Sequence, residues 1–285
     1  MLILDKIINH LKTNLDLASN YCHKHTVFAF GEEKIKPVQM MIIDGQEVCP
    51  RCELDKETEQ LSKQETERFK AAQENEKYNI FYKQSLVSDI TILEADFNSY
   101  EAKEPEEIRN KNMCLDMLDK YRQGNPFNLI LQGTQGVGKS HLAYSLLREL
   151  NESKSVSCAF ISISSMIEKI KESFSNKESR FTESYFNNLL MSLDYLVLDD
   201  LGAETGAILR NNQGEITTRA SDFVNRTLFN ICDKRQGKST IYTTNLASEE
   251  MRAIYEKRLV SRILSRPASI VFKETKDKRI NQLPF

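Results

Sequence analysis

The chain has 285 residues, of which 28% are charged and 40% are hydrophobic, with a formal net charge of −2. This length suits one domain of about 200 residues and a smaller module. The near-neutral charge excludes a global electrostatic attraction to nucleic acid, and no apolar run approaches the roughly 20 residues that span a bilayer. Asp5 and Lys6 interrupt the apolar start, which argues against a signal peptide. A cytoplasmic protein without a membrane partner is therefore expected.

The first residues carry an apolar stripe. Ile3, Ile7, Leu11 and Leu15 recur every four residues, which predicts an amphipathic helix over residues 1–18. Such a stripe packs on its own domain or docks on a partner, and the sequence does not separate the two.

Two pairs of metal-ligating residues follow, each with a two-residue spacer. Cys22 pairs with His25, and Cys49 pairs with Cys52. This spacing lets two ligands reach one tetrahedral ion from a tight turn. A module of about 50 residues with few large apolar groups also needs the stability that a metal supplies. The sequence predicts a Zn²⁺ site, with His23 as the alternative histidine ligand and free thiols as the alternative to a metal.

The segment between the two pairs reads as a hairpin around Asp44-Gly45. Residues 53–84 contain no glycine or proline and are rich in Glu, Lys and Gln, which favours a solvated helix that acts as a semi-rigid connector. We therefore predict a zinc-binding domain over 1–52, a charged helical connector and lead-in over 53–107, and a larger domain over 108–285.

In the larger domain, short apolar runs alternate with helical patterns. Strands are expected at 128–133, 157–163, 194–200, 239–245 and 268–274. Helices are expected at 139–150, 164–174, 182–192, 217–234 and 249–264. This alternation predicts an α/β fold with a parallel sheet flanked by helices.

The stretch GTQGVGKS fits G-x-x-x-x-G-K-[ST] at every fixed position, between a predicted strand and a predicted helix. Backbone N–H groups of such a loop face phosphates at the positive end of the helix. Lys139 is expected to reach the β- and γ-phosphates of ATP, and Ser140 to ligate Mg²⁺. The predicted nucleotide-binding residues are Gly133, Thr134, Gln135, Gly136, Val137, Gly138, Lys139, Ser140 and His141.

Polar residues end two further strands. Asp199 and Asp200 close an apolar strand, where Asp199 is expected to join the Mg²⁺ shell and Asp200 to orient or deprotonate the attacking water. Two acids can also merely cap a strand, but the upstream phosphate loop favours the catalytic interpretation. Asn245 ends the strand STIYTTN and is expected to position the water and sense the γ-phosphate.

With these motifs the chain resembles AAA+ ATPases. More narrowly, it resembles the DnaC/DnaI family of bacterial and phage replicative-helicase loaders, with the IstB transposition ATPases as relatives. The stretches that carry the resemblance lie in residues 108–285: GTQGVGKSHLAYSLL, DYLVLDDLGAE, NRTLFNICDKRQGKSTIYTTNL and EKRLVSRIL. The resemblance implies an AAA+ ATPase domain over these residues, with ATP and Mg²⁺ as cofactors.

The resemblance also implies that ATPase subunits assemble side by side, so that an arginine of one completes the site of its neighbour. The E-x-R-x-x-x-R box matches at Arg258 and Arg262, and Arg262 is the expected finger in trans. A further nucleotide-sensing arginine falls at Arg279, in a basic stretch KDKR that leaves its register open by one residue.

The implied function is that of a helicase loader. Its N-terminal zinc module holds the hexameric replicative helicase, and ATP-gated assembly on single-stranded DNA loads it. Many AAA+ enzymes have Glu where this chain has Asp200, so hydrolysis is expected to be slow. The alternatives are an IstB-like transposition helper, for which no zinc module is expected, and a non-catalytic adaptor that inhibits the helicase or its loader. The intact phosphate loop argues against the adaptor.

Overall fold

The computed structural model describes residues 16–29, 31–265 and 267–279. The chain divides into two compact units, Met1–Gln73 and Glu74–Phe285. Residues 1–15 of the helix predicted over 1–18 lie outside the described residues, while Asp16 is not helical and Leu17 and Ala18 begin a strand. Among the described residues no helix is long and apolar enough to cross a membrane.

The N-terminal unit is built from short antiparallel strands. They are β1 (Leu17–Cys22), β2 (Thr26–Ala29), β3 (Glu32–Ile35), β4 (Val38–Ile43) and β5 (Gln46–Val48). Strand β4 lies between β1 and β5, while β2 and β3 form a separate hairpin. The β4–β5 turn places Asp44 and Gly45 at positive φ, as the predicted hairpin requires. Among the residues from 16 onward that the structure describes in this unit, the buried apolar cluster consists of Met41 and Ile43, with Val48 packed against them.

Helix α2 (Pro50–Gln84) follows β5. Proline is well placed in its first turn, where the missing N–H has no intrahelical partner to lose. The boundary between the two units falls inside this helix, between Gln73 and Glu74. Near the end of the helix, Phe81 is fully buried in the core of the second unit. The proposed domain limits at residues 52 and 107 therefore stay predictions.

The second unit contains a five-stranded parallel sheet of order β10-β6-β9-β8-β7. Its strands are β6 (Asn128–Gly133), β7 (Cys158–Ser162), β8 (Tyr195–Leu201), β9 (Ser239–Thr244) and β10 (Pro267–Phe272). Each begins and ends within two residues of the predicted strand. The segment after α2 extends the edge of the sheet, because the Leu86 N–H donates to Phe160 O and the Ser162 N–H donates to Leu86 O. The predicted α/β class is confirmed.

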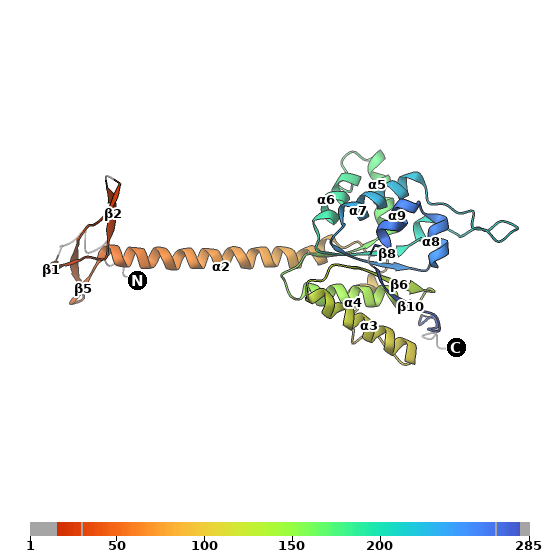
Figure 1. Cartoon of the computed structure of the whole chain (residues 1–285), viewed down its shortest axis with the longest axis horizontal. Helices are drawn as coiled ribbons and strands as arrows, with labels where there is room; N and C mark the ends of the chain where they lie inside the picture. Colours follow the sequence, from red (N-terminus) through yellow and green to blue (C-terminus); the bar gives the residue numbers. More distant parts are fainter. Residues whose placement is uncertain (1–15, 30, 266, 280–285) are drawn as a thin grey trace. The chain divides into compact units, whose positions relative to one another are not determined.

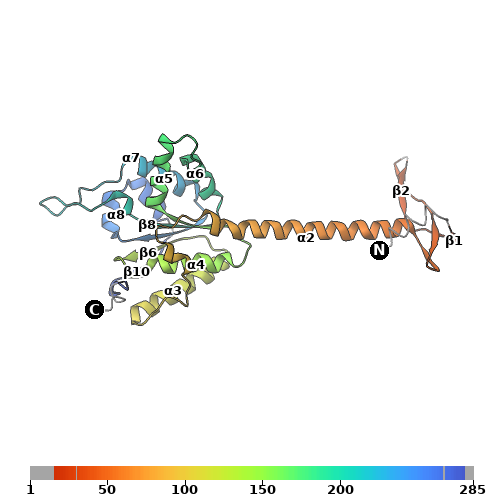
Figure 2. The same cartoon turned by 180° about the vertical axis from the view of Figure 1, so that it is seen from behind.

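Helices cover both faces of this sheet (Figure 1). On one face lie α3 (Pro105–Arg122) and α4 (Lys139–Asn151). The other face carries α5 (Ile163–Ser175), α6 (Glu183–Ser192), α7 (Asp222–Lys234), α8 (Ser248–Ile254) and α9 (Lys257–Ile263), as the reverse view in Figure 2 also shows. Two short 3₁₀ helices are Ile90–Glu94 and Ala203–Thr205.

Two predicted helices differ in their limits. The helix expected from residue 217 starts at Asp222, because the Ser221 side chain accepts a hydrogen bond from the Val224 N–H and caps the helix there. The helix expected over 249–264 is divided into α8 and α9, because Tyr255 and Glu256 have extended backbone between them.

Candidate active site and metal centre

The predicted nucleotide-binding side chains meet at one edge of the parallel sheet. The phosphate loop connects β6 to α4, and β6 lies between β9 and β10. All five strands are parallel, so the carboxyl ends of β6, β8 and β9 point the same way. In open α/β sheets, ligands bind outside the carboxyl ends of the strands, at the point where the strand order reverses.

The loop conformation depends on two glycines with positive φ. Gly138 caps α4 at φ 92°, and Gly136 has φ 75°. A Cβ at Gly138 would overlap the ring of Tyr100, which packs on the loop and donates its hydroxyl to Val137 O at 3.1 Å. Tyr100 therefore supports the phosphate loop from behind, a contact that its sequence position does not indicate.

Lys139 is buried and points back across the mouth of its own loop. Its Nζ donates to Gly133 O at 2.9 Å, to Thr134 O at 2.7 Å and to Asn245 Oδ1 at 2.7 Å. Burial lowers the pKa of Lys139 to about 8, although the carboxylates of Asp200 and Asp199 oppose this shift. The Lys139 amine therefore lies beside three oxygen acceptors, which the phosphate oxygens of a nucleotide would replace.

Asp199 lies at the buried end of β8. Its Oδ1 accepts from the Thr243 hydroxyl at 2.7 Å, and only 5% of the residue is exposed. Burial raises the pKa of Asp199, while hydrogen bonds from Thr243 and Ser140 lower it. The structure therefore brings together Ser140 and Asp199, the two residues predicted to hold Mg²⁺. A hydroxyl and a carboxylate are oxygen donors, which suit this ion.

Asp200 and Asn245 complete the polar cluster. The Asn245 Nδ2 donates to Asp200 Oδ1 at 3.3 Å, while its Oδ1 accepts from Lys139. One amide therefore links the phosphate-loop lysine to the second acid. Asp200 itself has φ 60°, a left-handed backbone conformation that is uncommon for residues other than glycine and that clusters at functional sites.

Three predicted site residues have their side chains outside this cluster. The His141 ring faces Asp96 O at 2.9 Å and Ser99 Oγ at 3.1 Å. Arg262 pairs with Asp233 of its own chain, Nε to Oδ1 at 2.8 Å, and is 36% exposed.

Arg279 is largely exposed, and its Nη2 lies 4.0 Å from Asp89 Oδ2. Its neighbour Lys278 is more closely attached to the site, because its N–H donates to Gly136 O at 3.0 Å and its Nζ lies 4.2 Å from the Tyr100 ring centre. Carboxylate Oε1 of Glu107 is 3.2 Å from the same Nζ. The C-terminal basic stretch therefore contacts the phosphate loop at Gly136, through the Lys278 N–H and through the carboxylate of Asp277, which lies where a Cβ of Gly136 would be.

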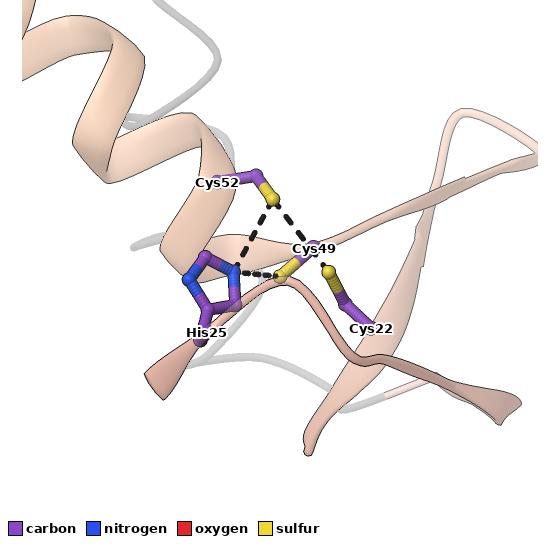
Figure 3. Close-up of side chains that lie close together, drawn as sticks. All are labelled: Cys22, His25, Cys49 and Cys52. Carbon is purple, nitrogen blue, oxygen red and sulfur yellow. Dashed lines mark hydrogen bonds between the residues drawn. The ribbon is translucent and has the colours of Figure 1, made fainter. Parts of the chain in front are cut away.

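The N-terminal unit brings Cys22, His25, Cys49 and Cys52 together (Figure 3). Their ligand atoms all lie within 4.8 Å of one another. His25 Nε2 is 3.2 Å from the Sγ atoms of both Cys49 and Cys52, and the Sγ atoms of Cys22 and Cys52 are 3.7 Å apart. Ligands of a tetrahedral zinc ion lie roughly 3.4–3.8 Å from one another. The distance between the Cys22 and Cys52 sulfurs falls in this range, and the two His25 distances lie slightly below it. Three sulfurs and one imidazole nitrogen gathered in this way are a donor set that suits Zn²⁺.

Local structure explains how this cluster forms. Cys22 ends β1, His25 lies in the next turn, Cys49 follows β5 and Cys52 is in the first turn of α2. His25 is buried whereas His23 is exposed, so the structure groups His25 with the cysteines. His25 Nδ1 is 3.5 Å from Asp55 Oδ2. A carboxylate behind a histidine fixes its tautomer and leaves the other nitrogen for a metal.

The fold and the nucleotide-site geometry define a class of protein, the AAA+ P-loop ATPases. The solved DnaC helicase loader has this fold, with a TM-score of 0.52 and 23% identity over 65% of this chain and 100% of its own. DnaI matches with a TM-score of 0.48 and 21% identity over 66% of this chain and 96% of its own. The search among curated proteins gave no match.

The family is shown by sequence. The family described as IstB-like ATP binding protein matches residues 83–269, well over half of the chain. The chain belongs to this family and is an ATP-hydrolysing enzyme.

Proposed function

We propose that this ATPase is a replicative helicase loader that binds the helicase through its N-terminal unit and loads it onto single-stranded DNA in an ATP-dependent step. The observation that carries the proposal is the convergence of Cys22, His25, Cys49 and Cys52 in a chain that also contains an AAA+ ATPase unit. The described part of this small unit buries an apolar cluster of Met41 and Ile43, and the unit would derive much of its folding free energy from Zn²⁺. The folded unit would then present a docking surface. We place this activity in the cytoplasm, where the cysteines stay reduced.

In the ATPase unit, each side chain of the polar cluster has a proposed task. The backbone from Gly133 to His141 would hold the phosphates, and Lys139 would leave its carbonyl partners for the β- and γ-phosphates. Ser140 and Asp199 would hold Mg²⁺, which offsets charge on the phosphate oxygens when it is bound. Asp200 would orient the attacking water and Asn245 would report the γ-phosphate to it.

Arg262 would act across an interface between subunits. Its pairing with Asp233 shows that the guanidinium is held at the surface of its own chain, where 36% of the residue stays exposed. A surface ion pair of this kind contributes little free energy. Arg262 would therefore lose little stability when it leaves Asp233 for a phosphate group bound by the neighbouring subunit. Assembly side by side would thus complete the hydrolytic site, with Arg279 as a proposed cis contact to the nucleotide.

A second candidate is a transposition helper ATPase, which the family match favours directly. The metal cluster separates the two functions, because a zinc module is expected for the loader and not for the helper. A non-catalytic adaptor that inhibits the helicase or its loader is a third candidate. It is less well supported, because Lys139, Asp199 and Asn245 are all in place.

The test is a loading assay on circular single-stranded DNA with the replicative helicase of the source organism. Helicase retained on the circles would be measured after gel filtration, with and without ATP. We expect the chain to increase the retained helicase when ATP is present and the Lys139→Ala variant not to do so, because the loop would lose its phosphate cation. Binding to DNA with no retained helicase would contradict the loader and favour the transposition helper. Blocked retention would favour the adaptor.

A further inference from the structure

We propose that Thr243 is a positioning residue for ATP hydrolysis, which holds both carboxylates at the end of β8 in their working orientations. The inference rests on the proposed roles of Asp199 and Asp200. Thr243 lies inside β9, on the neighbouring strand, and is 1% exposed.

The Thr243 hydroxyl joins the two acids through one donated and one accepted hydrogen bond. It donates to Asp199 Oδ1 at 2.7 Å and accepts from the Asp200 N–H at 2.8 Å. A hydroxyl can donate once and accept at the same time, whereas valine of similar shape can do neither. The side chain therefore contacts the carboxylate of one acid and the backbone of the next.

This contact falls where the backbone of β8 leaves its regular course. The parallel pairing of β8 with β9 shifts register between Leu198 and Leu201, and Asp200 has φ 60°. Left-handed backbone at a residue other than glycine persists only when its surroundings impose it. The Thr243 hydroxyl supplies a bond to the Asp200 N–H at this irregularity. It thereby helps to turn Asp200 toward Asn245, whose Nδ2 is 3.3 Å from Asp200 Oδ1.

The same hydroxyl orients Asp199. Thr243 Oγ1 lies 2.7 Å from Asp199 Oδ1, and both residues are buried. Fixing Oδ1 sets the carboxylate plane before an ion binds. Groups that orient metal ligands in this way change metal affinity or activity by roughly 10–100-fold when they are removed.

The competing explanation is that Thr243 only packs well, since β-branched residues suit strands. Valine keeps the branched shape and removes the hydroxyl, while serine keeps the hydroxyl and removes the methyl group. If the hydroxyl positions the acids, kcat and Mg²⁺ dependence must follow the hydroxyl. If shape alone matters, they must follow the methyl group.

The experiment compares full-length Thr243→Val, Thr243→Ser and wild type. We expect Thr243→Val to lower kcat by about 10–100-fold and to raise the Mg²⁺ concentration for half-maximal hydrolysis several-fold. Affinity for ATP without Mg²⁺ should stay within about twofold, because the phosphate loop is untouched. Thr243→Ser should restore kcat and the Mg²⁺ dependence to nearly wild-type values.

Thr227→Val is the matched control. Thr227 is equally buried in α7, and its hydroxyl makes no hydrogen bond within the described part of the chain. This variant should leave kcat and Mg²⁺ dependence unchanged. If Thr243→Val does not fold, as thermal unfolding would reveal, Thr243→Ala and Thr243→Ser carry the same comparison. Serine should then be active and alanine impaired.

A Thr243→Val variant with wild-type kcat and unchanged Mg²⁺ dependence would overturn the proposal. A Thr243→Ser variant with a strongly lowered kcat would also overturn it. Asp200→Asn separates this failure from a failure of the site itself. If Asp200→Asn hydrolyses ATP as wild type does, the proposed role of Asp200 is wrong. If Asp200→Asn is inactive and Thr243→Val is normal, only the positioning role of Thr243 is wrong.

Discussion

Lys139 is surrounded by oxygen acceptors from its own loop and from Asn245. Desolvation disfavours its charged form, so its pKa falls from the usual range to about 8. Phosphate groups would favour the ammonium form and raise this pKa again. Nucleotide binding should therefore be linked to uptake of a proton by Lys139 above neutral pH.

The prediction is that ATP affinity is nearly constant below pH 8 and falls as the pH rises from 8 toward the lysine's ordinary range. The sign follows because the free site is deprotonated there and the bound site is not. Equilibrium nucleotide titrations between pH 7 and 9.5 would check it, as would calorimetry in two buffers of different ionisation enthalpy. In Lys139→Arg the guanidinium stays charged, so whatever affinity remains should not fall over this range. A wild-type affinity that is flat to pH 9.5 would contradict the account.

Asp55 provides a second prediction at the residue scale. Its Oδ2 lies 3.5 Å from His25 Nδ1, where it would fix the imidazole for a metal at Nε2. We expect Asp55→Asn to weaken zinc binding by about 10–100-fold, as measured by competition with a chelator. Glu59→Gln, an exposed acid further along the same helix that pairs with Lys63, is the control and should bind zinc normally. Equal affinities in both variants would show that Asp55 does not orient His25.

Most residues that carry motifs could be found from the sequence, because their spacing reflects the geometry of a ligand. The phosphate loop and the two pairs of candidate zinc ligands belong to this kind, and the structure brings the two pairs together. Thr243 and Tyr100 could not be found this way. A threonine in a strand and a tyrosine in a loop are both ordinary, and their contacts with Asp199 and Gly138 exist only after distant segments pack together.

At the scale of elements, Arg235 joins the end of α6 to the start of β9. The guanidinium is 2% exposed and donates to Leu190 O, Leu193 O and Ser239 O at 2.6–2.9 Å. It also donates to Thr240 Oγ1 at 3.0 Å. Burial lowers the pKa of Arg235 to about 10, so the side chain remains charged near neutral pH. Of these acceptors, Leu190 lies in the last turn of α6 and Leu193 directly follows that helix. Ser239 and Thr240 begin β9.

We predict that Arg235→Met lowers the free energy of unfolding by at least about 3 kcal/mol, because several buried carbonyl oxygens lose their donors together. Urea unfolding would measure this loss. Arg226→Met is the control, since Arg226 lies in α7, the helix that Arg235 caps, but is mostly exposed. This variant should change stability by less than about 0.5 kcal/mol. A loss in Arg235→Met no larger than in the control would contradict the structural role of Arg235.

The elements of the sheet were predictable because apolar strands and helices differ in period. Helix α3 was not predicted. Its buried side includes the polar residues Glu106, Glu107 and Asn110, which weaken the apolar pattern. Burial alone would raise the pKa of Glu106, but its carboxylate accepts hydrogen bonds from the Thr275 hydroxyl and from the N–H groups of Lys273, Glu274 and Thr275, which lower its pKa to about 2. Buried polar residues of this kind find their hydrogen-bond partners in distant parts of the chain, so the apolar periodicity of the helix does not reveal that they are buried.

At the scale of the whole molecule, the proposed hydrolytic site needs two chains. Arg262→Ala should keep ATP affinity nearly intact and lose DNA-stimulated hydrolysis. Mixing it with Lys139→Ala subunits should recover part of the hydrolysis, because each variant supplies the half that the other lacks. Steady-state ATPase assays over a range of mixing ratios would measure this recovery. No recovery, together with weakened ATP binding by Arg262→Ala alone, would place Arg262 in cis.

The central claim is that the zinc unit holds the replicative helicase while a separate ATPase unit binds nucleotide. The most direct measurement is co-elution of the helicase with the full chain, compared with a Cys49→Ser, Cys52→Ser double variant. We predict that the double variant contains no zinc, still binds ATP through its own sheet and phosphate loop, and no longer co-elutes with the helicase. Helicase binding that survives in this zinc-free variant would contradict the account and would remove the reason to prefer a loader over a transposition helper.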